Sequence, residues 1–171
     1  MDTLLFGTAG SPASTPQSGS EAAVRQIRVL GLDCMELAWV RSVRIGQKKA
    51  QKIAQVAREN NVVLSVHAPY YINLNSAEPD KVKASRERIL AAARAGFWAG
   101  ARNIVFHPAF YHDDPPEVVY ERVKEHLQEI GEQLREEGVE VVLRPETTGK
   151  PSQFGSLEEL IQLSRELEGV Q

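Results

Sequence analysis

The 171-residue sequence has a single cysteine and no long apolar run. With Cys34 alone, the chain can form no internal disulfide. For the same reason it cannot build a metal site from several thiolates. No window approaches the ~20 apolar residues of a membrane span, and the N-terminus lacks a basic stretch followed by an apolar core. We therefore expect a cytoplasmic protein with no membrane partner. Cys34, between Asp33 and Met35, is expected to be a small buried packing residue rather than a nucleophile.

The sequence also lacks a large net charge, which is only -3. Its distribution is uneven, with 14 Lys/Arg against 8 Asp/Glu in residues 1–112 and 6 against 15 in residues 113–171. A basic N-terminal part can face a polyanion. Most of these charges recur at helical spacing, however, which favours solvated helix faces. Charge alone therefore identifies no partner.

What the sequence does contain is an alternation of short apolar strands with amphipathic helices. Strands are predicted at residues 4–10, 34–40, 62–66, 103–106 and 139–143, and helices at residues 20–30, 46–60, 79–100, 115–138 and 156–167. Such alternation predicts a parallel sheet wrapped by helices. A closed eight-stranded α/β barrel takes ~250 residues. We therefore expect an incomplete (β/α) TIM-barrel type of fold with about five β-α units, forming one domain over residues 1–171 that lacks the last three strands.

Several details of this assignment can be tested. Ser20 is the expected N-cap of the first helix, and Phe97 is expected to face inward from the third. The last helix should begin at Ser156 and turn four residues toward the core, which are Leu157, Leu160, Ile161 and Leu167. Gly169, Val170 and Gln171 resemble the turn into a sixth strand.

Three strand ends carry the candidate ligands. His67 follows the apolar run of residues 62–66, His107 follows the strand of residues 103–106, and Glu146 follows the last predicted strand after Arg144 and Pro145. The carboxyl ends of parallel strands meet at one edge of the sheet, where ligands bind in such folds. Histidine and glutamate side chains bind zinc. A lone histidine at a strand end is more often a hydrogen-bonded structural residue, so the prediction rests on the three together.

Other polar and aromatic residues allow two readings each. Glu36, inside a predicted strand, either points into a polar barrel interior near the site or lies at the rim with an ion-pair partner. Tyr70 and Tyr71 either pack on the following helix or offer a stacking platform for a base or sugar. Asn73 and Asn75 can hydrogen-bond a phosphate or sugar and are equally common as turn formers. The two remaining histidines are expected to face solvent, and these are His112 and His126.

Five segments in the same order resemble the endonuclease IV family, the apurinic/apyrimidinic endonucleases of DNA base-excision repair, and in particular its archaeal and thermophile-like branch. These segments are LLFGTAGSPAST, GLDCMELAWVRSVRIG, SVHAPYYINLNS, NIVFHPAFY and VVLRPETTGK. The most specific are HAPYYINL, FHP and PET.

The resemblance implies a function and a set of site residues. His67, His107 and Glu146 resemble the ligands of one zinc in a trinuclear cluster, with Glu146 as the catalytic carboxylate that bridges to a second zinc. Tyr70 resembles the loop tyrosine that enters the minor groove beside a flipped abasic nucleotide, and Asn73 on the same loop is a second expected DNA contact. The implied reaction is cleavage of the phosphodiester bond 5′ to an abasic site in double-stranded DNA.

The remaining ligands of the family, carried by an Asp-x-x-His segment, a further His, an Asp-x-His pair and a final Glu, are not among these 171 residues. The chain is therefore expected to hold one Zn²⁺ at most, where the family holds up to three, and to incise DNA slowly. Two alternatives stay open. One is a sugar isomerase or epimerase of the xylose isomerase type, and the other is a non-catalytic remnant that binds DNA.

Overall fold

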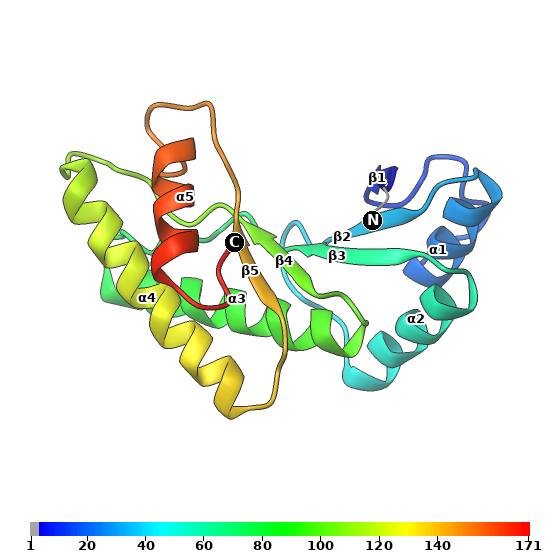
Figure 1. The fold of residues 1–171 in the computed structure, drawn as a ribbon. Coiled ribbons are helices and arrows are strands. Elements are labelled where there is room, and N and C mark those ends of the chain that lie inside the picture. The colour runs from blue at the N-terminus through cyan, green and yellow to red at the C-terminus, as the bar shows by residue number, and fades with distance from the viewer. Residues whose placement is uncertain (1–3) are drawn as a thin grey trace.

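A computed structural model describes residues 4–171 and consists of a five-stranded parallel sheet with helices packed along its convex side (Figure 1). The elements are β1 (Gly7–Ala9), α1 (Ser20–Val29), β2 (Cys34–Ala38), α2 (Gln47–Glu59), β3 (Val63–His67), α3 (Pro79–Trp98), β4 (Asn103–Phe106), α4 (Pro116–Glu136), β5 (Val142–Pro145) and α5 (Leu157–Glu166). Strand and helix alternate throughout, which confirms the predicted α/β class. In the part of the chain described, no helix has both the length and the apolar composition needed to cross a bilayer.

The strands lie in sequence order, β1-β2-β3-β4-β5, and every neighbouring pair is parallel. This is the strand order of a TIM barrel. Within residues 4–171 the sheet does not close, so β1 and β5 are its two edges. The structure thus confirms an incomplete barrel of five β-α units.

The predicted turn at Gly169–Gln171 lies along the free edge of β5. Val170 forms a parallel bridge with Leu143. The N–H of Leu143 donates to the carbonyl of Gly169 at 2.8 Å, and the N–H of Gln171 donates to the carbonyl of Leu143 at 3.1 Å. These residues therefore occupy the place where a sixth strand would begin.

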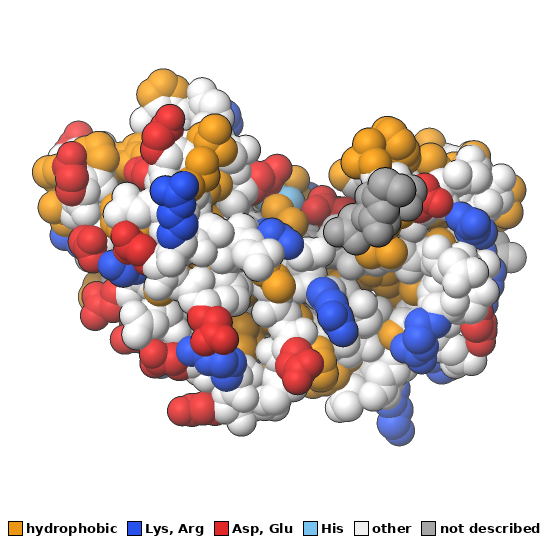
Figure 2. Space-filling view, viewed as in Figure 1, with side chains coloured by type: hydrophobic (Ala, Val, Ile, Leu, Met, Phe, Trp, Pro, Cys, Tyr) orange, Lys and Arg blue, Asp and Glu red, His pale blue; other side chains and the backbone are white. Residues whose placement is uncertain are grey.

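The two faces of the sheet differ in composition. One face packs on the helices and supplies core residues from alternate strand positions, which are Met35, Leu37, Leu64, Val66, Ile104, Phe106 and Leu143. The side chains between them lie on the opposite face, which in a closed barrel would line the lumen. We call this the open face, and its residues are Glu36, Ser65, His67, Asn103, Val105, Val142 and Arg144. In the space-filling view the molecule is hollowed on this side, and histidine and acidic side chains are visible in the hollow (Figure 2).

Two strands begin three residues later than predicted. β1 is confined to Gly7–Ala9, and Leu4 and Phe6 before it are exposed. Gly7 is needed there, because a Cβ on residue 7 would lie 1.8 Å from the carbonyl oxygen of Cys34. The last strand begins at Val142 rather than residue 139, because the N–H of Val139 is still used to close the end of α4 on the carbonyl of Leu134.

Two predictions about the helices were also wrong. Gly19, not Ser20, is the N-cap of α1, and Ser20 is its first residue. Phe97 is 39% exposed. For α5, the N-cap Ser156 is confirmed, with a full capping box to Glu159.

The buried face of α5 is rotated from the one expected. Leu157 and Ile161 are exposed, while Leu163 and Leu167 are buried and Leu160 packs against the core. Residues 160, 163 and 167 follow the spacing of three and four that one narrow helix face provides. Five leucine and isoleucine positions on a short helix allowed more than one such face, and only the packing against the neighbouring elements selected it.

Candidate metal centre

His67, His107 and Glu146 converge at the carboxyl ends of β3, β4 and β5. Backbone hydrogen bonds continue past the strands and fix their relative heights: the N–H of Ala68 donates to the carbonyl of Val105 at 2.8 Å, and the N–H of Glu146 donates to the carbonyl of Phe106 at 2.9 Å. One ligand atom from each of the three side chains lies within 4.8 Å of the other two. The geometry predicted from the three strand ends is therefore present.

The distances suit a single metal ion. The Oε2 atom of Glu146 lies 3.1 Å from Nε2 of His67 and 3.4 Å from Nε2 of His107. In a tetrahedral zinc site with bonds of about 2.1 Å, neighbouring ligand atoms are about 3.4 Å apart. Two imidazoles and one carboxylate also leave a fourth position for water or substrate. These residues fit a zinc ion.

The orientation of the His67 ring supports this assignment. Its Nδ1 atom lies 2.8 Å from the carbonyl oxygen of Ala68, and because a carbonyl can only accept, Nδ1 carries the proton. In the neutral ring Nε2 then bears a lone pair that faces the carboxylate of Glu146. The two groups repel each other unless a proton or a metal ion lies between them. A backbone carbonyl that holds the second ring nitrogen is the usual partner of a metal-binding histidine.

His107 is electrostatically suited to the same role. Burial lowers the pKa of its imidazole, and the nearby His67 and Lys150 lower it further, against the opposing effect of Glu146. The ring is therefore neutral near pH 7, and the neutral form is the one that binds metal. Its buried Nδ1 atom has no hydrogen-bond partner among residues 4–171.

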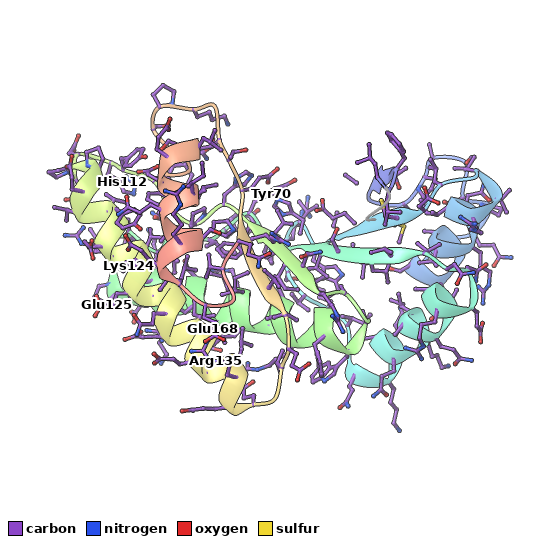
Figure 3. The ribbon with its side chains drawn as sticks, in the orientation of Figure 1. Tyr70, His112, Lys124, Glu125, Arg135 and Glu168 are labelled. Carbon is purple, nitrogen blue, oxygen red and sulfur yellow. The ribbon has the colours of Figure 1, made fainter. Side chains whose placement is uncertain are left out.

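Tyr70 lies against both histidines from the loop after β3. Its ring stacks on that of His107 with centroids 6.3 Å apart and meets the His67 ring edge-on at 5.2 Å. Even so, the residue is 55% exposed. Figure 3 shows Tyr70 beside the ends of β4 and β5, at the mouth of the hollow, whereas His112 lies well away from it near the start of α4. Tyr70 thus offers an exposed aromatic ring beside the candidate ligands.

The two asparagines of this loop hold the loops together. The Oδ1 atom of Asn73 accepts from the backbone N–H groups of Asn75 and Phe110, and its Nδ2 atom contacts Nε2 of His112 at 3.0 Å. Contact between Asn73 and DNA stays a prediction. Asn75 is 3% exposed, and its amide donates to the carbonyl of Phe110 and to Asp114. The buried Asn75 side chain therefore ties two loops together, whereas the turn-forming contact is the one that Asn73 accepts from the N–H of Asn75.

Other expectations had mixed outcomes. His112 is exposed, as predicted, but His126 is not solvent-facing, because its side chain is only 22% exposed between α3 and α4. Cys34 is half-buried rather than buried, and burial together with Asp33 raises the pKa of its thiol. That shift disfavours the reactive thiolate and agrees with a packing role.

Glu36 lies on the open face, so the first of its two readings is correct. It pairs with Ser65, two residues before His67 on β3, and the charges of both His67 and Glu146 act on it. Burial raises the pKa of its carboxyl, Glu146 raises it further, and His67 opposes them. On the same face, Arg144 lies in the row of His67, and its guanidinium donates to Asn103 at 3.0 Å. Neither Asn103 nor Arg144 was singled out as a site residue, since each follows the ordinary alternation of a strand.

The sequence profile of the family described as xylose isomerase-like TIM barrel matches residues 24–170. An uncharacterized protein of Methanocaldococcus jannaschii is 41% identical over 164 residues, which are 96% of this chain and 58% of that protein. A probable endonuclease 4 of Geobacillus is 35% identical over 100 residues, which are 57% of this chain and 33% of that protein. The chain thus spans little more than half, or less, of the length of the curated relatives it matches.

Two solved structures show the same fold. Endonuclease IV from Thermus thermophilus superposes with a TM-score of 0.69 at 21% identity, covering 94% of this chain and 58% of that one. D-psicose 3-epimerase from Clostridium cellulolyticum, solved with D-tagatose, superposes with a TM-score of 0.71 at 16% identity, covering 91% of this chain and 57% of that one. At these identities the likeness concerns the fold alone.

Proposed function

Because the chain belongs to the xylose isomerase-like TIM barrel family, we propose that it is a zinc-dependent endonuclease that cleaves the phosphodiester bond 5′ to abasic sites in double-stranded DNA. The observation that carries the proposal is the convergence of His67, His107 and Glu146 within 4.8 Å at one sheet edge. The sequence similarity to a probable endonuclease 4 favours this activity over sugar epimerization, since the epimerase is similar in fold only.

The residues of the site have separable roles in this proposal. His67 and His107 would bind the zinc through Nε2, with His67 held in the required tautomer by the carbonyl of Ala68. Glu146 would complete the ligand set and balance part of the metal charge. When bound, zinc neutralises phosphate charge and lowers the pKa of water so that a nucleophile is available near pH 7. Tyr70 would stack against a nucleotide next to the phosphate, because its ring is exposed beside His107.

Incision of an end-labelled duplex with one abasic site tests the proposal. The 171-residue chain, dialysed against EDTA and then supplied with zinc, should cut 5′ to the abasic site and leave a 3′-hydroxyl group. EDTA and the variants His107→Ala and Glu146→Gln should abolish cutting. His126→Gln is the matched control, because it changes a histidine of α4 that is not a candidate ligand, and it should cut like the wild type.

The alternatives predict other results. A sugar isomerase or epimerase, favoured by the fold likeness to D-psicose 3-epimerase, would convert a ketose with the same metal dependence and leave abasic DNA uncut. A non-catalytic DNA-binding protein would bind duplex in a salt-sensitive way that survives EDTA. Either result without incision would contradict the endonuclease proposal.

A further inference from the structure

Glu36 is a charged residue near the metal centre that is not one of its candidate ligands. It is half-buried on the open face of β2, between the core residues Met35 and Leu37. Its carboxylate makes no hydrogen bond or ion pair with any residue from 4 to 171, although the other carboxylate of the site, Glu146, contacts both histidines. A carboxylate withdrawn from water without a partner costs stability. A bound molecule that donates a hydrogen bond to the carboxylate would offset this cost.

The position of Glu36 limits what that partner can be. The strand register pairs it with Ser65 and places it one pleat deeper in the open face than His67. Ser65 in turn pairs with Asn103, so Glu36 begins a row of an acceptor, a hydroxyl and an amide below the metal centre. The guanidinium of Arg144 is on the same face but is engaged by Asn103. A carboxylate acceptor beside a hydroxyl and an amide provides the kind of polar groups that bind sugar hydroxyls.

We infer that Glu36 is a substrate-binding residue that accepts a hydrogen bond from a sugar hydroxyl group lying below the metal centre. The inference rests on the proposed function, because it places the sugar next to the zinc that His67, His107 and Glu146 would hold. Two sources share this chemistry. One is the deoxyribose of an abasic site, which carries a hydroxyl on C1, and the other is a free ketose.

Binding measurements on the zinc-loaded chain distinguish the sources. The first probe is a duplex with a natural abasic site, compared with its tetrahydrofuran analogue, which lacks the C1 hydroxyl, both carrying a non-hydrolysable phosphonate 5′ to the lesion. Wild type should bind the natural site about tenfold more tightly, as expected for one hydrogen bond to a charged group. Glu36→Gln, whose amide oxygen accepts a weaker hydrogen bond than a carboxylate does, should reduce this preference and leave binding of the analogue unchanged. The second probe is D-tagatose or D-fructose, whose binding by titration calorimetry should be weakened in the variant if the source is a free sugar.

Control variants separate a local effect from a folding defect. Glu140→Gln changes an exposed carboxylate outside the open face and should bind every probe like the wild type. Glu36→Asp keeps the charge but shortens its reach by one methylene, and it should lose most of the preference while keeping the wild-type melting temperature.

The outcomes also separate this inference from the endonuclease proposal. If Glu36→Gln keeps the full preference for the natural abasic site and the wild type binds no ketose, the inference is overturned while the endonuclease proposal stands. If the wild type binds a ketose through Glu36 and does not prefer abasic to intact duplex, the inference stands and the endonuclease proposal fails. Absence of binding to both probes would overturn the inference.

Discussion

Replacing Glu146 by glutamine should remove most of the thermal stabilisation that zinc gives the chain. Groups that merely hydrogen-bond to a zinc ligand contribute about 10- to 100-fold to metal affinity. Glu146 contacts both histidines at 3.1 and 3.4 Å and is itself a candidate ligand, so its loss should weaken binding at least about 100-fold.

This loss of zinc affinity can be converted into a change in melting temperature. At a zinc concentration 100 times the wild-type Kd, binding stabilises the folded state by about 2.7 kcal/mol, whereas a variant with a 100-fold larger Kd gains only about 0.4 kcal/mol. For a chain of this size each kcal/mol shifts the Tm by about 2 to 4 °C. Zinc should therefore raise the wild-type Tm by about 5 to 11 °C and that of Glu146→Gln by about 1 to 2 °C.

Scanning calorimetry of EDTA-dialysed protein, with and without zinc, measures both shifts. Without metal the variant should melt within a few degrees of the wild type, because the side chain of Glu146 is 43% exposed and solvent screens its contacts with the two histidines. Glu140→Gln is the control and should keep the full zinc shift. A Glu146→Gln variant that keeps that shift too would refute the assignment of this carboxylate as a ligand.

Two further predictions concern stability without metal. Burial lowers the pKa of both His107 and His126 below the usual 6.5. The unfolded chain then binds more protons than the folded chain, so the free energy of unfolding should fall as the pH drops below about 6.5. Urea unfolding in EDTA from pH 7.5 to 5 should show a smaller fall for His126→Gln, and an unchanged fall would contradict the assignment. Gly7→Ala should lose about 1 to 3 kcal/mol in the same assay because its Cβ would overlap the carbonyl of Cys34. Gly149→Ala, where the added methyl meets open space, should be nearly neutral.

The order and type of the elements could be predicted because each depends on local pattern. Short apolar runs that alternate with helices of period three to four leave few arrangements other than a parallel sheet wrapped by helices. The boundaries could not be predicted as well. Val139 is as apolar as the strand residues after it, yet its N–H closes α4, and the competition between these two uses depends on where the helix packs.

The candidate site shows the same division. His67, His107 and Glu146 could be named from the sequence because parallel strands bring their carboxyl ends to one edge whatever the details of packing. The roles of Asn73 and Asn75 could not be predicted in the same way, since an asparagine that binds a ligand and one that ties two loops together look identical in a sequence. Only the positions of Phe110 and Asp114, more than 30 residues away along the chain, decide it.

The sequence by itself therefore determined the fold class, the number of β-α units and the three residues at the strand ends, since all of these follow from local periodicity and chain order. The tertiary structure decided which face of α5 is buried, how the ring of His67 is oriented and where the carboxylate of Glu36 lies. These depend on contacts between distant parts of the chain. Such contacts select among side-chain arrangements that the local sequence permits equally.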